Sequence, residues 1–144
     1  MRTVRRCQRV PYGAGQMFDL VNDLESYPEF LPWCRASRVE RRAETEIVAT
    51  LDVGFAGVHK CFTTRNSLHR PHRVDIELVD GPFRSLHGTW RFEAHSGPGC
   101  EVQLELDFEV AHTPLDRLFG LFFEDIVRSQ VAAFVRRAGS VYGG

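Results

Sequence analysis

The stretch EVQLELDFEVAHTPLDRLFGLFFEDIVRSQVAAFVRRAGS, residues 101–140, contains two different hydrophobic periods in succession. In its first ten residues apolar and polar side chains alternate, which is typical of a β-strand with one buried face and one face toward water. We expect Leu104, Leu106 and Phe108 to point inward. Because antiparallel sheets commonly leave one face solvated and parallel sheets do not, this alternation favours an antiparallel sheet over a parallel α/β core.

The second part of the same stretch predicts a long helix. Thr113 can cap it, Pro114 suits the first helical position, and Asp116 suits the positive end of the helix dipole. From there to about Ser140 only Gly120 weakens the helical pattern. Such a helix is roughly 40 Å long. A strand of nine residues spans roughly 30 Å, so the helix can cross the whole sheet.

Alternation of period two recurs upstream of this stretch, which predicts further strands of the same sheet. The alternating segments are residues 47–53, 58–64, 74–78 and 86–92. Glycine, proline and short polar residues separate them and favour turns. These connections are residues 54–57, 69–72, 80–83 and the loop 94–100.

The first third of the chain predicts one polar strand and two small helices. Residues 2–10 indicate the strand, and residues 14–23 carry apolar side chains on one helical face. In ESYPEFLPWC (25–34), Pro28 and Pro32 permit a single helical turn at most. The whole chain, 1–144, therefore predicts one α+β domain: a curved antiparallel sheet of about seven strands gripping one long C-terminal helix.

Composition places the chain among ordinary globular proteins. Hydrophobic residues make up 43% and charged residues 26% of the sequence, and the formal net charge is −1. This charge gives no general attraction to nucleic acid or to an anionic membrane. The N-terminus MRTVRRCQRV has no apolar signal core, and no apolar run approaches the ~20 residues that cross a bilayer. We expect a soluble, cytoplasmic protein.

The sequence contains none of the short motifs that carry common catalytic or metal chemistry. Its four cysteines form no CxxC pair and its six histidines have no metal-ligand spacing, so we expect no metal site and mostly buried, reduced thiols. Nucleophile-elbow and phosphate-loop motifs are absent as well. Lys60 is the one residue that alternation could turn inward as an acid or base, although an exposed lysine is commoner. We therefore expect no enzyme and no catalytic residues.

Four motifs together resemble one family. They are YPEFLPWC, VDGPFRSLHGTWRFE, GCEVQLELDFEV and the terminal AGSVYG, spread from about Val10 to Gly143. The chain is similar to the START-like family (polyketide cyclase, SRPBCC) that contains the coenzyme Q-binding proteins of yeast and animals and the bacterial ribosome-association toxin RatA. The arginine-rich first strand departs from the usual pattern, which leaves its pairing in the sheet open.

The resemblance implies a helix-grip fold with an apolar tunnel between sheet and helix. It implies binding of ubiquinone or another polyprenyl lipid in support of respiration, with bound ubiquinone as the one cofactor-like group. A fully packed core is the alternative, since protein interiors are normally close-packed. The expected cavity residues are Phe30, Pro32, Trp33, Phe62, Phe83, Trp90, Phe92, Phe108, Phe119, Phe122 and Phe123. A polyketide-cyclase-like enzyme would need an acid or base among them.

The bacterial branch of the family implies a different partner, the large ribosomal subunit, whose joining to the small subunit would be blocked. Two arginine groups could then contact ribosomal RNA with strong salt dependence. The candidates are Arg5, Arg6, Arg9, Arg38, Arg41 and Arg42. A solvated surface is the alternative interpretation of both groups, and the sequence leaves open whether they share one face.

Overall fold

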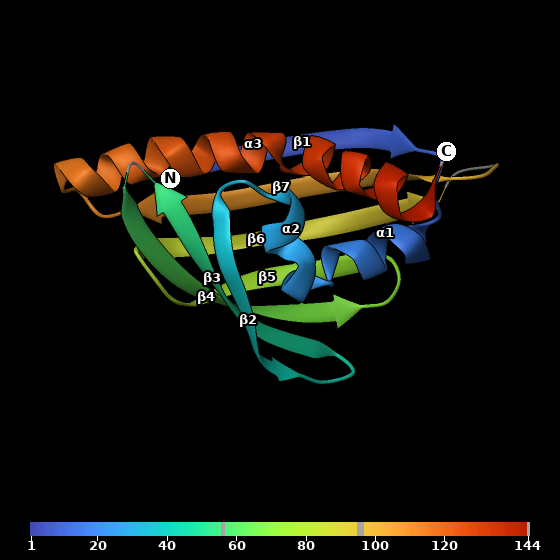
Figure 1. Cartoon of the computed structure of the whole chain (residues 1–144), viewed down its shortest axis with the longest axis horizontal. Helices are drawn as coiled ribbons and strands as arrows, with labels where there is room; N and C mark the ends of the chain where they lie inside the picture. The colour runs from blue at the N-terminus through green and yellow to red at the C-terminus, as the bar shows by residue number, and fades with distance from the viewer. Residues whose placement is uncertain (56, 95–96, 144) are drawn as a thin grey trace.

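The chain folds as a single antiparallel sheet crossed by a long helix (Figure 1). The computed structural model describes every residue except 56, 95, 96 and 144. The elements, in chain order, are β1 (Arg2–Val10), α1 (Ala14–Val21), a 3-10 turn (Leu24–Ser26), α2 (Tyr27–Phe30), β2 (Cys34–Arg42), β3 (Glu46–Phe55), β4 (Val58–His69), β5 (Arg73–Asp80), β6 (Phe83–Ala94), β7 (Cys100–Val110) and α3 (Pro114–Tyr142). The expected helix-grip fold is confirmed.

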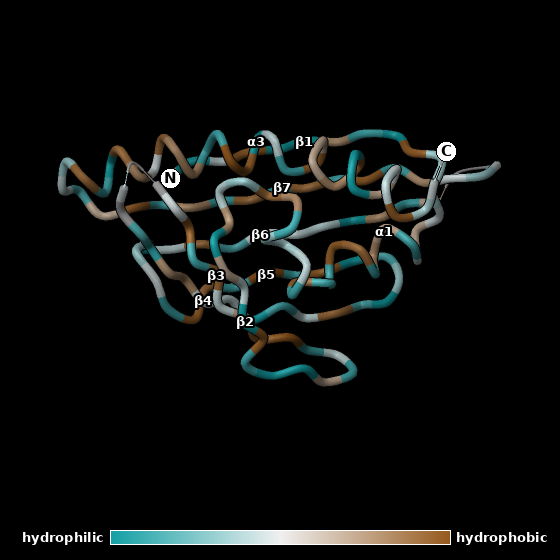
Figure 2. Tube along the Cα trace, viewed as in Figure 1, coloured by the Kyte–Doolittle hydropathy of each residue, from teal (hydrophilic) through white to brown (hydrophobic). Residues whose placement is uncertain are grey.

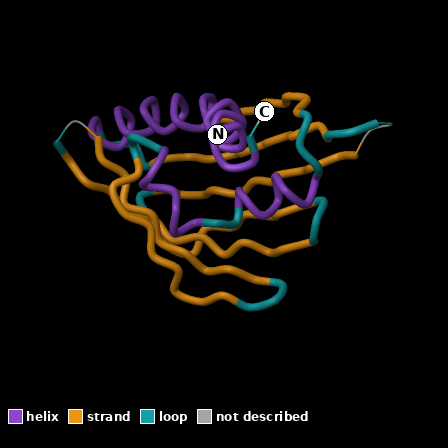
Figure 3. Tube along the Cα trace, turned by 45° about the vertical axis from the view of Figure 1, so that its right-hand side comes forward, coloured by secondary structure: helices purple, strands orange, loops and turns teal. Residues whose placement is uncertain are grey.

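The sheet has seven strands in the order β1-β7-β6-β5-β4-β3-β2, so β1 and β2 are its two edges. The strands curve beneath α3, and their concave face is turned toward the helix (Figure 3). The arginine-rich strand β1 pairs with β7 along its whole length, from Arg2 opposite Phe108 to Val10 opposite Cys100. This register resolves the pairing that the sequence left open.

Alternation in β7 is the clearest link between sequence and packing. Leu104, Leu106 and Phe108 are at most 6% exposed, and the charged residues between them lie on the other face. The hydropathy colouring alternates along the strands in the same way (Figure 2). Burial of these apolar side chains, at about 25 cal/mol per Å², provides most of the driving force for packing α3 on the sheet.

Helix α3 begins as the sequence predicts. The Thr113 hydroxyl accepts a hydrogen bond from the backbone N–H of Asp116 at 3.1 Å, and Pro114 occupies the first turn. Gly120 does not interrupt the helix; a Cβ there would lie 3.0 Å from the side chain of Val110. The glycine therefore lets the helix approach the end of β7 closely.

The two short helices cover the same concave face as the second half of α3. α1 buries Met17, Phe18, Leu20 and Val21. The Tyr27 hydroxyl donates to the Val21 carbonyl, and the Tyr27 ring packs against Phe134 of α3 with centroids 5.3 Å apart. These contacts connect the proline-rich segment to the long helix.

Strand β2 is the one strand whose position the sequence pattern did not give. It carries register shifts between Cys34 and Ala36 and between Val39 and Arg41, so its side chains do not follow a clean alternation. The burial expected for the cysteines holds for Cys34 and Cys100, whereas Cys7 and Cys61 are exposed; all four are free thiols. Cys7 lies on edge strand β1, where little covers it.

Two further observations concern the described part of the chain. No helix there is both long and apolar enough to cross a membrane. No group of three or more His, Cys, Asp or Glu side chains among those residues is arranged to hold a metal ion.

Candidate ligand-binding cavity

A cavity of about 90 Å³ lies between α3 and the concave face of the sheet. Strands β3 to β7 form its floor, and Phe123, Ile126 and Val127 of α3 form its roof. The segment between α1 and β2 closes one side through Val21, Leu24, Tyr27 and Trp33. The space between sheet and helix is therefore mostly filled by side chains, but a small apolar cavity remains.

Both tryptophans of the chain belong to this wall. Trp90 is 5% exposed and its ring meets Phe134 edge-on at 5.4 Å. Trp33 is half-buried, and its carbonyl accepts from the backbone N–H of Gly54 at 3.0 Å, which attaches it to β3. A molecule entering the cavity would therefore meet two indole rings, whose fluorescence can report binding.

Three polar residues interrupt the apolar wall. Thr64 and Asn66 of β4 are each 8% exposed, and the Thr64 hydroxyl donates to the Asn66 side-chain oxygen at 3.0 Å. They face inward because they share parity with Phe62. From α3, Gln130 reaches the same cavity, and its buried Oε1 atom has no hydrogen-bond partner among the described residues.

The cavity wall contains no ready acid or base. None of its described residues is Asp, Glu, Lys, Arg, His or Cys. Its one phenol, Tyr27, donates to a backbone carbonyl, and burial raises the pKa of its hydroxyl far above the ordinary value. Lys60 does not line the cavity. The arrangement can enclose an apolar group and hydrogen-bond an oxygen, but offers no proton donor or acceptor that titrates near neutrality.

Four of the aromatic residues expected from the sequence line this cavity: Trp33, Phe62, Trp90 and Phe123. They come from the segment before β2 and from β4, β6 and α3, so the fold brings together residues up to 90 positions apart. The alternation of period two correctly placed Phe62 and Trp90 on the concave face, and helical periodicity placed Phe123 opposite them.

The other expected cavity residues lie elsewhere. Phe83, Phe108 and Phe119 pack around Phe123 away from the cavity, with Phe83 and Phe123 centroids 4.8 Å apart. Phe92 has no exposure and stacks on Trp90 at 6.1 Å. Each of these rings packs against another aromatic ring at contact distance, and together they fill the core.

Phe30, Pro32 and Phe122 also fall outside the wall. Phe30 packs edge-on against Phe134 at 5.2 Å, and the Arg137 guanidinium lies 4.9 Å from its ring centre. Pro32 is exposed. Phe122 of α3 is half-buried and packs against the core. The proline-rich segment thus contributes Tyr27 and Trp33 to the cavity, Phe30 packs beside it, and both prolines are exposed.

Thr64, Asn66 and Gln130 were not among the residues expected from the sequence. Their signal was present but weak: Thr64 and Asn66 continue the inward parity of β4, and Gln130 lies one helical turn after Ile126 and Val127. From sequence alone, a polar residue in a strand is usually assigned to the solvent-exposed face. Only the register of the sheet shows that these residues face inward.

The two arginine groups lie on opposite edges of the sheet, Arg5, Arg6 and Arg9 on β1 and Arg38, Arg41 and Arg42 on β2. Most of them face a carboxylate: Arg5 pairs with Glu105, Arg38 with Glu40, Arg41 with Glu46 and Arg42 with Glu25, at 2.6 to 3.5 Å.

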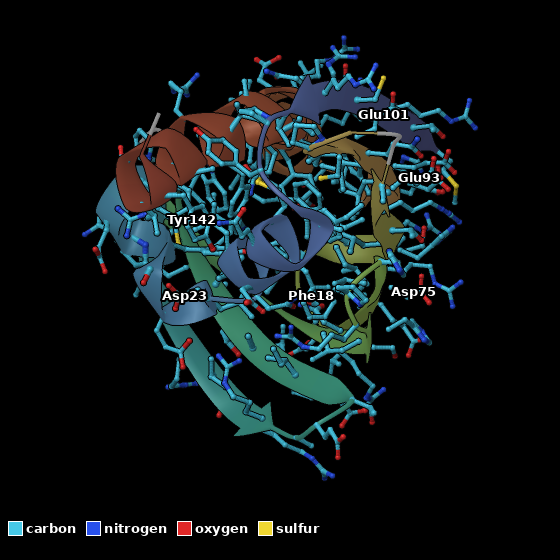
Figure 4. The ribbon with its side chains drawn as sticks, turned by 90° about the vertical axis from the view of Figure 1, so that its right-hand side faces the viewer. Phe18, Asp23, Asp75, Glu93, Glu101 and Tyr142 are labelled. Carbon is cyan, nitrogen blue, oxygen red and sulfur yellow. The ribbon has the colours of Figure 1, made fainter. Side chains whose placement is uncertain are left out.

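The outer face of the sheet is highly polar, and Asp75, Glu93 and Glu101 lie on that side (Figure 4). Arg6 donates to the Arg5 carbonyl at 2.9 Å and, like Arg9, forms no ion pair with a described residue. Arg6 and Arg9 are therefore the candidate arginines whose charge no described carboxylate neutralises.

Comparison with known proteins begins with a family model, described as polyketide cyclase/dehydrase and lipid transport, that matches residues 10–135. A curated relative, "Ribosome association toxin RatA" of Escherichia coli K12, is 42% identical over 142 residues, covering 99% of this chain and 90% of the relative. A second, "Coenzyme Q-binding protein COQ10 homolog B, mitochondrial" of Xenopus laevis, is 32% identical over 136 residues, covering 89% of this chain and 54% of the relative.

Solved structures show the same fold. The Zhui aromatase/cyclase from Streptomyces sp. R1128 superimposes with a TM-score of 0.83 at 17% identity, covering 99% of this chain and 98% of that one. A START superfamily protein from Mycobacterium smegmatis has a TM-score of 0.68 at 20% identity, covering 90% and 97% of the two chains. These likenesses concern the arrangement of sheet and helix.

Proposed function

Because the chain belongs to the polyketide cyclase/dehydrase and lipid transport family, we propose that it binds a hydrophobic molecule between α3 and the sheet. The proposed ligand is a quinone, ubiquinone foremost, or another polyprenyl lipid. The observation that carries the proposal is the apolar cavity whose wall contains Trp33 and Trp90. The similarity to a relative named for coenzyme Q binding supports the same class of ligand.

The chemistry of the wall favours such a ligand. Each methylene that leaves water contributes about 0.8 kcal/mol, so a tail of two isoprene units is sufficient for useful affinity. The indole of Trp33 can stack on a quinone ring because this side chain lines the cavity and is only half-buried.

The size of the cavity sets a condition on binding. It measures about 90 Å³, whereas pockets for drug-sized ligands occupy about 300–1,000 Å³. A ligand with a ring and a prenyl tail therefore has to displace side chains or separate α3 from the sheet. We expect bound ligand to change the packing of Ile126 and Val127, which form the roof.

The proposed role is binding without catalysis. The structural neighbour named an aromatase/cyclase shows that this fold can belong to an enzyme. In this chain, however, the described wall residues provide no side chain that exchanges protons near neutral pH. Retention of an offered quinone without chemical change is the expected behaviour, and liquid chromatography of the extracted ligand measures it.

Tryptophan fluorescence tests the binding proposal directly. Titration with a ubiquinone carrying two isoprene units should quench the fluorescence of Trp33 and Trp90 to saturation. Val127→Phe, which adds volume to the roof of the cavity, should abolish the saturable part. The matched control is Val141→Phe on the same helix, because Val141 is 50% exposed and away from the cavity wall.

Solvent extraction of protein purified from quinone-producing cells provides a second test, with mass spectrometry as the readout. Co-purifying quinone or prenyl lipid supports the proposal. Protein that carries no such molecule and shows no saturable quenching contradicts it.

A second candidate function is association with the large ribosomal subunit. The observation in its favour is 42% identity over nearly the whole chain to a relative named ribosome association toxin RatA. Arg6 and Arg9 on edge strand β1 are the two arginines of the candidate groups without an ion pair among the described residues. They are the strongest candidates for phosphate contacts, and the predicted cytoplasmic location suits this role.

Sedimentation of ribosomes with added protein tests the second candidate. Arg6→Gln with Arg9→Gln should weaken association, and rising salt should weaken it further because counterions compete for phosphate. The matched control is Arg38→Gln with Arg41→Gln on the opposite edge, where both arginines are paired with glutamates. Unchanged subunit joining at low salt contradicts the proposal.

A further inference from the structure

We propose that Thr64, Asn66 and Gln130 form a polar end of the cavity that selects uncharged ligands with a hydroxyl or carbonyl oxygen and rejects carboxylates and phosphates. This inference rests on the proposed binding function and specifies the chemical class of its ligand. It is carried by one buried acceptor without a partner, one buried hydroxyl–amide pair and a wall without charge.

The three residues reach the cavity from opposite sides. Thr64 and Asn66 come from the floor of the cavity, on β4, and Gln130 comes from the roof, on α3. All the other described wall residues are aliphatic or aromatic. A ligand oxygen therefore finds its hydrogen-bond partners only at this trio, apart from the indole and phenol groups of Trp33, Trp90 and Tyr27.

The hydrogen bonds of these three residues leave some polar groups without a partner. The Thr64 hydroxyl donates to the Asn66 oxygen, and this bond leaves the N–H groups of the same amide available to a ligand. The Gln130 oxygen is buried and has no described donor. An unsatisfied buried polar group costs about 1–3 kcal/mol. A ligand hydroxyl that donates to the Gln130 oxygen recovers this cost, and a ligand carbonyl gains a hydrogen bond from the Asn66 amide.

The described wall residues carry no charge, and this accounts for the proposed rejection of anions. No arginine, lysine or histidine there could neutralise an anion. Moving a carboxylate or phosphate from water into such a site without a counter-ion is strongly unfavourable. Fatty acids and phospholipid head groups should therefore remain outside, whereas quinones, prenyl alcohols and aldehydes can enter.

Four probes of equal carbon skeleton test the proposal: geraniol, geranial, geranic acid and 2,6-dimethylocta-2,6-diene. The change in intensity and wavelength of Trp33 and Trp90 emission at pH 7.5 measures each affinity. Geraniol and geranial should bind about tenfold or more tightly than the carboxylate, and several-fold more tightly than the hydrocarbon. Equal binding of all four overturns the selectivity but leaves the proposed function intact. Binding of none overturns both.

Variants identify the residues responsible. Gln130→Met keeps the length of the side chain and removes its amide, and Thr64→Val removes one hydroxyl. Each should lower the preference for geraniol over the hydrocarbon several-fold while hydrocarbon binding is retained. The matched controls are Gln103→Met and Thr63→Val, because Gln103 bonds to Glu101 and Thr63 to Thr50, outside the cavity. An unchanged preference in both cavity variants overturns the assignment.

Discussion

The four cysteines of the chain show how burial alone separates residues of one type. Burial is the main cause that raises the pKa of the Cys34 thiol to about 11; a hydrogen bond with the Ala36 backbone opposes this rise, and the charge of Asp52 adds to it. Burial also raises the pKa of Cys100. Because the thiolate is the reactive form, buried and exposed cysteines should differ greatly in reactivity.

Alkylation at pH 8 should therefore modify Cys7 and Cys61 first. The thiolate fraction of Cys34 is roughly a hundredfold lower than that of an ordinary cysteine, and its buried position slows access further. Peptide mass spectrometry after timed iodoacetamide treatment measures the order. Denatured protein is the control, in which all four should react alike. Early modification of Cys34 in the native protein would contradict its burial.

A second residue whose surroundings shift its pKa is Glu124. It lies on α3 and accepts from Arg2 of β1 at 2.6 Å and from Arg128 at 2.7 Å. These hydrogen bonds, followed by the positive charges of the same arginines, lower the pKa of its carboxyl. A lowered folded-state pKa stabilises the fold fully above the unfolded value near 4.3, and this contribution is lost as pH falls through the folded value.

Glu124→Gln should accordingly lower the free energy of unfolding at pH 7 by about 1 kcal/mol. The difference from the original protein should shrink as the pH drops below about 4. Urea unfolding at several pH values measures both. Glu105→Gln is the matched control, because the Arg5–Glu105 pair is largely exposed and should contribute little. A difference that grows toward acid pH would rule out this account.

At the scale of single elements, Gly88 in the middle of β6 shows why the sheet needs a glycine there. It lies opposite Leu106 of β7, and a Cβ built on it would come within 2.4 Å of the Leu106 side chain and 2.6 Å of the Glu105 carbonyl oxygen. The end of the Leu106 side chain can rotate, but the Glu105 carbonyl is backbone and cannot move without disturbing β7.

Gly88→Ala should therefore destabilise the protein by about 1–3 kcal/mol. Gly15→Ala is the matched control: Gly15 lies in α1 with nothing within 4 Å of the new Cβ, so that variant should gain up to about 1 kcal/mol. Thermal unfolding of both variants measures the contrast. Equal melting temperatures would mean that β6 and β7 can separate locally without cost.

The strands and helices differed in how well the sequence predicted their positions. β7 and α3 were predictable to within two residues because long, regular periods determine them, and a capping threonine fixes where α3 begins. β2 was not, because two bulges break its alternation and its outward positions carry arginines that suit any exposed segment. Pairing with β3, a contact between distant residues, makes this segment a strand.

For the whole molecule, the proposed function predicts that binding and stability are coupled. A ligand that binds only the folded state at a hundred times its Kd stabilises it by about 2.7 kcal/mol. For a chain of 144 residues, this corresponds to a rise in melting temperature of about 5–10 °C. Differential scanning fluorimetry with the two-isoprene ubiquinone measures it.

Val127→Phe should not show this rise in melting temperature. With the cavity filled, its melting temperature should not respond to the quinone, whereas the Val141→Phe control should respond like the original protein. A melting temperature that does not change for any of the three would contradict ligand binding at this site.

The amino-acid sequence specified the local structure: period-two alternation favoured the strands, the 3.6-residue period and a Thr-Pro start favoured α3, and prolines confined the segment before β2 to short turns. It also determined which side chains are apolar enough to be buried. Strand pairing and helix packing, in contrast, set which aromatic residues fill the core and which border the cavity. Phe83 and Phe123 are equally hydrophobic, yet Phe123 lines the cavity and Phe83 packs beside it. Strand register and the height of α3 above the sheet fix that difference, and both depend on contacts between residues far apart in the chain, which local patterns do not encode.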